Sequence, residues 1–447
     1  MVDKARNAAL KLLRDIDIKK GYINLEIKPA LKDNSLSTLD RAFITDIVYG
    51  VTRYRLTLDW LIKRYSRGGK ASPWIRNILR MGMYQILYMD RVPDFAACDS
   101  SVELAKKYAG QREAGYVNAV LRRLIQEKDD LVSLFPQDTV SRIALKYSFP
   151  EWMVRLWLNT MSETLAEELC AAQNIRPSLT IRANELKISQ DGLIKLLEQR
   201  SIMYSCGVYL PEALNIEQNV DVESLPGYDD GLFAVQDEAS MMVAHVVDPR
   251  PGQIIIDACS APGGKAVHMA QFMKDQGRIL SVDVYPHRIE LIKAQCARLG
   301  VNCIEPVCYD STVYNEDWYG MADAVLIDAP CSGLGIIRHK PDIKWRRAEK
   351  DIGELLQIQR QILDTCSLYV KPRGVLIYST CTINPDENQN MVNSFLNDHS
   401  DFILDDVYQK LPHALSASRD NGDKWVQFYP NEDKIDGFFV ARMLKVR

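Results

Sequence analysis

The chain has 447 residues, of which 47% are hydrophobic and 26% charged, and this composition excludes a disordered or fibrous chain. No apolar stretch approaches the roughly 18 residues of a membrane-spanning helix, and the charged, amphipathic start lacks a signal-peptide centre, so we expect a cytoplasmic protein. The length favours about two to four domains over one compact core.

Cysteine usage argues against a secreted or metal-binding scaffold. The ten cysteines include no C-x-x-C pair, and the six histidines are scattered. Without an export signal, we expect reduced thiols rather than disulfides. The spacing also disfavours zinc ligation, so we expect no metal.

Basic residues are concentrated in the first third of the chain. Residues 1–145 hold 25 Lys and Arg against 17 Asp and Glu, whereas the remainder holds 30 against 42. Between residues 53 and 80 a single acid, Asp59, accompanies the basic residues Arg53, Arg55, Lys63, Arg64, Arg67, Lys70, Arg76 and Arg80. Interleaved aromatic residues make this stretch a candidate RNA-binding surface; the alternative is a solvated helix face above a core.

Residues 1–140 are expected to form an all-helical domain. Apolar residues recur at spacings of three and four, starting with Ala9, Leu12, Leu13 and Ile16. The pattern continues over 39–51, 74–89, 98–108 and 116–125, with glycine or proline breakers between these segments.

Residues 141–235 are expected to form a small α+β linker domain of RRM-like type. Helices are predicted over 151–159 and onward to about 173, followed by a strand over 179–184. A helix over 190–200 and short strands near 202–209 and 231–235 complete this module.

Residues 236–447 alternate between strands and helices, which predicts an α/β fold around a parallel sheet. Strands are expected over 254–256, 279–282, 303–307, 324–327, 375–378 and 438–441. Helices are predicted over 286–299, which Pro286 opens and Gly300 follows, and over 352–370. Asn384-Pro385-Asp386-Glu387 resembles a capped helix start.

Three motifs follow predicted strands at the sheet edge where open α/β folds bind ligands. DACSAPGGK at 257–265 contains a Gly263-Gly264 turn, whose N–H groups can approach a ligand carboxylate. Asp283 can accept hydrogen bonds from ribose hydroxyls and Asp310 from an adenine amino group, although either could be only a helix cap. Together these residues predict a site for a nucleoside with an amino-acid tail, S-adenosylmethionine.

DAPCSG at 328–333 and YSTCT at 378–382 each place a cysteine just after an apolar run. A thiolate that adds to carbon 6 of a cytosine makes carbon 5 nucleophilic toward a methyl group. Asp328 can hydrogen-bond the ring nitrogen or amino group of that base. A lone cysteine here is more often a small core residue. Two cysteines at the ends of neighbouring strands favour the interpretation as a site of cytosine methylation.

These motifs resemble the NOL/NOP/Sun family of RNA (cytosine-5)-methyltransferases. DACSAPGGK, VDVYPHR, YDST, DAPCSGLG, YSTCT and the terminal DGFFVARM stand in that family's order and spacing. The resemblance implies a Rossmann-like class I S-adenosylmethionine-dependent methyltransferase domain at 236–447. It further implies a NusB-like RNA-binding domain at 1–140, before the small α+β domain at 141–235.

The resemblance also implies roles for individual residues. Cys381 would be the nucleophile and Cys331 would assist product release, with Asp328 beside them. Cofactor contacts carry over to Cys259, Ser260, Ala261, Pro262, Gly263, Gly264, Lys265, Asp283, Asp310 and Asp328. Ser260 stands where many relatives have alanine, which should affect only cofactor fit.

The implied substrate is 16S ribosomal RNA at cytosine 967 in the usual bacterial numbering, and the implied enzyme acts as a monomer without a membrane partner. The residues alone support only a cytosine in RNA. Methylation of a transfer RNA or of another ribosomal cytosine stays open, as does a non-catalytic RNA-binding assembly factor. A nicotinamide-dependent dehydrogenase would fit the sheet but would leave the two cysteines unexplained.

Overall fold

A computed structural model describes residues 3–19, 21–33, 35–66, 71–218, 220–412, 415 and 422–447. Arg67 and Lys70, two members of the candidate RNA-binding stretch, lie outside the described residues. The chain divides into two compact units. The helical unit comprises Met1–Ile175 with Ile337–Glu349, and the sheet unit comprises Arg176–Ile336 with Lys350–Arg447.

The helical unit follows the predicted pattern of amphipathic helices. Its helices are α1 (Lys4–Lys19), α2 (Ile23–Leu31), α3 (Thr38–Arg53), α4 (Arg55–Tyr65), α5 (Pro73–Tyr88), α6 (Asp94–Ala109), α7 (Gln111–Glu127), α8 (Thr139–Tyr147), α9 (Glu151–Leu158), α10 (Glu163–Asn174) and α15 (Ile343–Arg346). Helix α3 begins with a capping box in which Ser37 and Asp40 bond reciprocally, and Ser72 caps α5 ahead of Pro73. The expectation of an all-helical start is confirmed.

The segment Ile337–Glu349 begins two residues after the end of the DAPCSGLG motif, yet it packs within the helical unit. The buried Lys344 Nζ donates to Asn174 Oδ1 at 2.7 Å and to the Arg53 carbonyl at 3.2 Å. Trp345 Nε1 donates to the Thr52 carbonyl at 2.7 Å. Sequence periodicity assigned this segment to the last domain, because hydrogen bonds between distant segments leave no local pattern.

The small sheet of the sheet unit has four strands in the order β2-β3-β1-β4, all antiparallel. They are β1 (Leu179–Ala183), β2 (Tyr204–Cys206), β3 (Ala213–Ile216) and β4 (Phe233–Val235), and α11 (Gln190–Gln199) packs on them. Strand β3 pairs with both β1 and β2, and it was not predicted from the sequence.

The large sheet has eight strands in the order β10-β12-β9-β8-β5-β6-β7, with β11 paired to β12. They are β5 (Ile254–Asp257), β6 (Arg278–Asp283), β7 (Ile304–Cys308), β8 (Ala322–Asp328), β9 (Val370–Thr380), β10 (Phe402–Asp405), β11 (Val426–Phe428) and β12 (Phe438–Lys445). Strands β5 to β9 are parallel, whereas β10, β11 and β12 pair antiparallel. The sheet is therefore mixed: the expected parallel arrangement is confirmed for β5 to β9, whereas β12 adds to β9 in the antiparallel direction.

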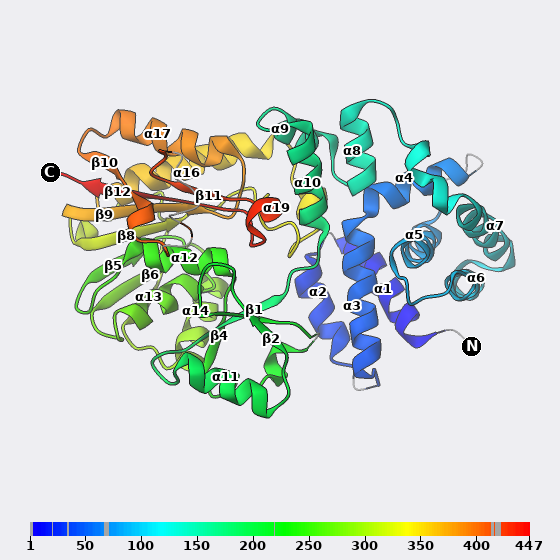
Figure 1. The fold of residues 1–447 in the computed structure, drawn as a ribbon, viewed down its shortest axis with the longest axis horizontal. Coiled ribbons are helices and arrows are strands. Elements are labelled where there is room, and N and C mark those ends of the chain that lie inside the picture. Colours follow the sequence, from blue (N-terminus) through cyan, green and yellow to red (C-terminus); the bar gives the residue numbers. More distant parts are fainter. Residues whose placement is uncertain are drawn as a thin grey trace. The chain divides into compact units, whose positions relative to one another are not determined.

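Helices cover both faces of this sheet (Figure 1): α12 (Glu238–Val247), α13 (Gly264–Phe272) and α14 (Pro286–Leu299) on one, α16 (Asp351–Ser367) and α17 (Gln389–Asp398) on the other. Ile255 packs with the first group and Ile256 with the second. Strands buried on both faces need apolar residues at every position, which explains the continuous Ile-Ile-Ile run.

Two predicted helix boundaries differ from the structure. Helix α16 ends at Ser367, and Val370 already begins β9, which continues through Pro372 and Gly374 beside a register shift. The capped start at Asn384 opens the 3₁₀ turn η4 (Pro385–Glu387), and α17 begins only at Gln389. Within the described ranges, no helix combines the length and apolar character needed to cross a membrane.

Candidate active site

The candidate site lies where the strand order reverses. Strand β5 lies between β8 and β6 in the sheet. The chain passes from β5 to β6 on one side and later returns to β8 on the other side. Loops diverge at such a point and open a crevice at the carboxyl ends of the strands. The DACSAPGGK motif follows β5 and the DAPCSG motif follows β8, which brings both motifs to this crevice.

The glycine turn has the shape that ligand approach requires. Gly263 adopts a φ of 101° and immediately precedes α13, where a side chain would be strained. A Cβ placed on Gly264 would meet no atom within 4 Å, so the backbone there faces open space. The first N–H groups of α13 are thus accessible to an anionic group of a ligand.

Lys265 and Asp328 form an ion pair across the crevice. Lys265 Nζ lies 2.7 Å from Asp328 Oδ2, and Ser379 Oγ donates to Asp328 Oδ1 at 3.0 Å. Burial alone would lower the pKa of Lys265, but Asp328 and further negative charge at Cys381 and Asp257 hold that pKa above its usual value. Lys265 therefore supplies a fixed positive charge beside Cys381.

Asp257, at the end of β5, was not among the predicted site residues. It is fully buried, and neither carboxylate oxygen accepts a hydrogen bond of good geometry. Burial raises the pKa of this carboxyl to about 7, with a further contribution from Asp328. The sequence feature that could have identified Asp257 was its place as the first residue of the DACSAPGGK motif. A buried acid with only weak interactions from the Ser260 hydroxyl and the Cys259 N–H fits a site for a cationic ligand group.

The two motif cysteines meet at the carboxyl ends of β8 and β9. Cys331 Sγ lies 3.4 Å from Cys381 Sγ, and both side chains are partly exposed. The hydrogen bond to Cys381 and then burial raise the pKa of Cys331 well above its ordinary value, with smaller contributions from Glu387 and Asp328. The raised pKa favours a neutral thiol at Cys331, within hydrogen-bond distance of the second sulfur.

Backbone contacts fix the loop that carries Cys381. The Gly335 N–H donates to the Cys381 carbonyl at 3.0 Å, and the Gly437 N–H donates to the Gly335 carbonyl at 3.0 Å. A Cβ at Gly335 would lie 1.9 Å from the Gly437 carbonyl oxygen. Only glycine permits this approach of the DAPCSGLG and DGFFVARM motifs.

The two acids predicted to hold a nucleoside lie at neighbouring strand ends. Asp283 is buried at the end of β6, where it accepts from the Tyr285 N–H at 3.0 Å and pairs with Arg288 at 3.5 Å. Asp310 is exposed two residues after β7 and accepts from the Thr312 N–H and hydroxyl. Both carboxylates therefore also stabilise their own turns.

The remaining residues of the glycine-rich motif line the same turn. Cys259 is partly exposed, and burial followed by neighbouring acids raises the pKa of its thiol well above the ordinary range, which disfavours a nucleophilic role. Ser260 is buried and bonds to the Ser281 hydroxyl. Ala261 is partly exposed and Pro262 is exposed at the tip of the turn.

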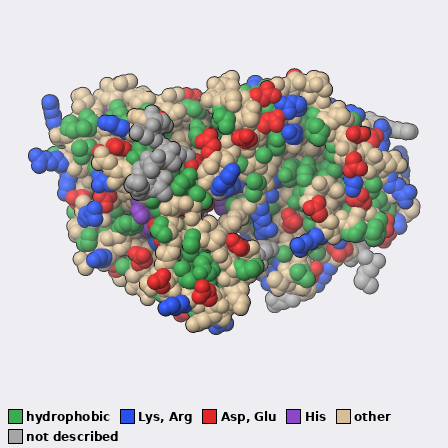
Figure 2. Space-filling view, viewed as in Figure 1, with side chains coloured by type: hydrophobic (Ala, Val, Ile, Leu, Met, Phe, Trp, Pro, Cys, Tyr) green, Lys and Arg blue, Asp and Glu red, His purple; other side chains and the backbone are tan. Residues whose placement is uncertain are grey.

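The structure divides the candidate RNA-binding stretch into buried and exposed members. Arg53 is buried and donates to the Arg338 carbonyl at 3.1 Å, and the buried Arg80 pairs with Asp17 and Asp59. Arg55 pairs with the same two acids. Lys63 and Arg64 near the end of α4, and Arg76 on α5, have exposed side chains. Figure 2 shows basic and acidic side chains interspersed on the visible face.

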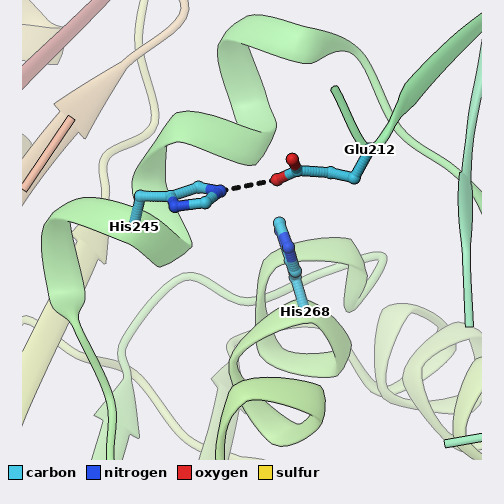
Figure 3. A group of neighbouring side chains, drawn as sticks. All are labelled: Glu212, His245 and His268. Carbon is cyan, nitrogen blue, oxygen red and sulfur yellow. Dashed lines mark hydrogen bonds and ion pairs between the residues drawn. The ribbon is translucent and has the colours of Figure 1, made fainter. Parts of the chain in front are cut away.

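Glu212, His245 and His268 form a second cluster, between the small sheet and helices α12 and α13 (Figure 3). His245 Nε2 lies 2.6 Å from Glu212 Oε1; burial opposes the Glu212 charge, but His245 keeps the pKa of that carboxyl below its usual value. Burial and then the positive Arg182 lower the pKa of His268 well below its ordinary range. The fully buried Arg182 also disfavours a further cation, and the Glu212–His245 hydrogen bond joins the small sheet to helix α12.

A glycine turn at the switch point, with acids at the following strand ends, places the chain in the class of Rossmann-like folds that bind a nucleoside. The family model described as 16S rRNA methyltransferase RsmB/F matches residues 244–444. The NusB family model matches residues 3–126, and the RsmF/B-like ferredoxin-like domain model matches residues 149–223.

Similar proteins cover the whole chain. The probable ribosomal RNA small subunit methyltransferase B of Bacillus subtilis is 34% identical over 443 residues, 98% of each chain. That of Synechocystis is 35% identical over 445 residues, 99% of each chain. The crystal structure of PH0851 superposes with a TM-score of 0.82 at 27% identity and covers 98% of both chains.

The chain belongs to the ribosomal RNA small subunit methyltransferase B family. The family consists of S-adenosylmethionine-dependent methyltransferases, and the expected fold class and family resemblance are confirmed. The matched family models follow the order of the three expected domains, whose boundaries at 140 and 235 stay a prediction.

Proposed function

We propose that this protein methylates carbon 5 of a cytosine in small-subunit ribosomal RNA through a covalent bond between Cys381 and the base. The observation that carries the proposal is the 3.4 Å separation of the Cys331 and Cys381 sulfurs beside the Lys265–Asp328 pair. A structural cysteine needs neither a second thiol nor a neighbouring ammonium group. The names of the Bacillus and Synechocystis relatives support the choice of RNA.

The chemistry follows from the charges around Cys381. The S–H of Cys331 and the ammonium of Lys265 both stabilise a thiolate at Cys381. That thiolate adds to carbon 6 of the cytosine while Asp328 hydrogen-bonds the ring nitrogen or amino group. The added electron density makes carbon 5 a nucleophile. Carbon 5 takes the methyl group, and the donor sulfonium leaves as a neutral thioether. A base or solvent water then takes the proton of carbon 5 as the carbon–sulfur bond breaks, and the Cys381 thiolate is restored, assisted by Cys331.

The methyl donor in this proposal is S-adenosylmethionine, which supplies an electrophilic methyl group on a sulfonium. The N–H groups of Gly264 and Lys265 would hold its carboxylate, and Asp283 and Asp310 would hold its ribose and adenine. The buried Asp257 would face its positive ammonium or sulfonium group. Cys259, Ser260, Ala261 and Pro262 would shape the turn around it.

Covalent trapping tests the proposal. The protein and S-adenosylmethionine are incubated with small-subunit RNA that contains 5-fluorocytosine, and the products are separated on a denaturing gel. Because fluorine does not leave carbon 5 as a proton does, we expect a stable RNA–protein adduct that maps to Cys381. No adduct, given demonstrated cofactor binding and cytosine 967 in the RNA, would contradict the proposed substrate or reaction. Repeating the trapping with other RNAs would then distinguish an enzyme that acts on a different RNA from an inactive protein.

RNA contact by the helical unit is part of the same proposal, with Lys63 and Arg64 as its basic residues. The double charge reversal Lys63→Glu and Arg64→Glu is expected to weaken RNA binding about tenfold or more near 0.1 M salt. It should also reduce the slope of log Kd against log salt by about 1 to 2. Binding is measured by filter retention across a salt series.

The control is the reversal of two exposed lysines on α6, Lys106→Glu and Lys107→Glu, which changes the net charge equally. Unchanged RNA binding by the Lys63→Glu and Arg64→Glu variant would show that this basic stretch is only a solvated helix face. Equal losses in both variants would assign the effect to net charge. A cytoplasmic location, where ribosomal RNA is found, and action as a monomer are further parts of the proposal.

A further inference from the structure

A buried carboxylate connects the two cysteine loops. Glu387, in the η4 turn after β9, has no exposed surface. Its Oε1 accepts from the Ser332 N–H at 2.8 Å and from Gln359 Nε2 at 3.0 Å. Its Oε2 accepts from the Ser332 hydroxyl at 2.6 Å. Ser332 is the residue directly after Cys331, so both oxygens hold the first cysteine loop.

The second cysteine loop is bonded to the same carboxylate. Oε2 also accepts from the Asn384 amide at 3.2 Å and from the Thr382 hydroxyl at 3.4 Å. Thr382 directly follows Cys381, and its hydroxyl lies 2.7 Å from that of Ser332. One side chain therefore joins the residues that follow each cysteine, while β8 and β9 fix the residues that precede them.

We propose that Glu387 is a positioning residue that sets the separation and orientation of the Cys331 and Cys381 thiols. The inference rests on the proposed function, because it assigns Glu387 to the reaction that these two cysteines carry out. Glu387 would touch neither the RNA base nor the methyl donor, since it is fully buried behind the loops.

The contacts require a carboxylate rather than another polar side chain. Five donors converge on Glu387, and three of them, the Ser332 N–H and the side-chain amides of Gln359 and Asn384, can only donate. Gln359 also donates to the Pro330 carbonyl at 3.0 Å, which extends the network to the residue before Cys331. Glutamine at position 387 would have the same size but only one acceptor oxygen. Some of the donor groups would then lose their hydrogen bond to residue 387.

The first test compares Glu387→Gln with Glu238→Gln. Glu238 is also buried and accepts from three backbone N–H groups, of Val208, Tyr209 and Leu210, away from the cysteine loops. We expect Glu387→Gln to lower kcat for methyl transfer about 10- to 100-fold, because small misplacements of reacting groups have effects of that size. The KM for RNA and the Kd for S-adenosylmethionine should stay within about twofold. Glu238→Gln should leave kcat unchanged at temperatures well below its Tm.

The second test reads the sulfur geometry without RNA. Diamide oxidises two adjacent thiols to a disulfide and is itself reduced to the hydrazine. In the wild-type protein we expect a Cys331–Cys381 disulfide, identified by peptide mapping under non-reducing conditions. Its rate of formation should fall at least about fivefold in Glu387→Gln and stay at the wild-type value in Glu238→Gln. Ser332→Ala removes one donor and keeps the charge, so it provides a milder variant should Glu387→Gln fail to fold.

Equal kcat and equal disulfide rates in wild type, Glu387→Gln and Ser332→Ala would overturn the positioning role. A lower Tm with unchanged kcat and disulfide rate would do the same, because it would leave Glu387 a purely stabilising residue. If wild-type protein forms the disulfide but methylates no cytosine-containing RNA, the proposed function fails, and the disulfide rates still decide the role of Glu387.

Discussion

Replacement of Cys381 by alanine is expected to abolish methyl transfer to small-subunit RNA, a loss on the order of 10⁴-fold or more. Without a thiolate that adds to carbon 6, carbon 5 of cytosine lacks the electron density to accept a methyl group. Removal of a nucleophile leaves only the contribution of binding and orientation. Transfer is measured with radiolabelled S-adenosylmethionine, and cofactor binding by calorimetry should remain at the wild-type value.

The matched control for Cys381→Ala is Cys206→Ala, which removes an exposed cysteine of β2 in the small sheet. That variant should retain full activity. Residual transfer by Cys381→Ala near the wild-type rate would reject Cys381 as the nucleophile. Adduct formation with 5-fluorocytosine RNA distinguishes the two sulfurs directly, because the trapped peptide identifies the attacking residue.

Replacement of Cys331 by alanine is expected to accumulate a covalent RNA–protein adduct even with unmodified RNA. In the proposed reaction Cys331 assists breakage of the bond between Cys381 and carbon 6, so its loss should slow release more than attack. The raised pKa of Cys331 and its position 3.4 Å from Cys381 suit a neutral thiol that acts on the other sulfur. The adduct should survive denaturation and appear as a slowly migrating band.

Two variants check the assignment of roles. Cys331→Ala combined with Cys381→Ala should form no adduct, because the attacking sulfur is gone. An adduct that forms in Cys381→Ala but not in Cys331→Ala would reverse the roles of the two cysteines. Absence of any adduct in Cys331→Ala, with turnover retained, would point to a release step that needs no second thiol.

The sequence alone located the central strands and the motifs at their ends. The predicted strand at 254–256 corresponds to β5, and the helix predicted over 286–299 has the observed bounds of α14. Both succeed because the signal is local: a doubly buried strand needs a continuous apolar run, and a helix start and stop show as Pro286 and Gly300. The antiparallel pairing of β12 with β9 was not predicted, because the two strands lie far apart in sequence.

The candidate site was predictable in its motif residues but not in its interactions. Cys331, Cys381 and the glycine turn follow strands whose carboxyl ends share one edge, so their convergence follows from topology. The partners of these residues do not follow from spacing. Lys265 was predicted as a cofactor contact, and only the structure pairs it with Asp328. Glu387 was noted only as part of a helix start, because its five donors come from three separate segments.

By itself the sequence determined the fold class and the family, and it placed the motif residues proposed to carry the chemistry at one edge of the sheet, because these depend on short motifs and on hydrophobic periodicity. The tertiary structure decided which charges are free to act. Arg53 and Arg80 look like Lys63 and Arg64 in the sequence, yet the first two are buried against a carbonyl and two carboxylates. Burial and pairing depend on residues brought together from distant parts of the chain, and no local pattern records them.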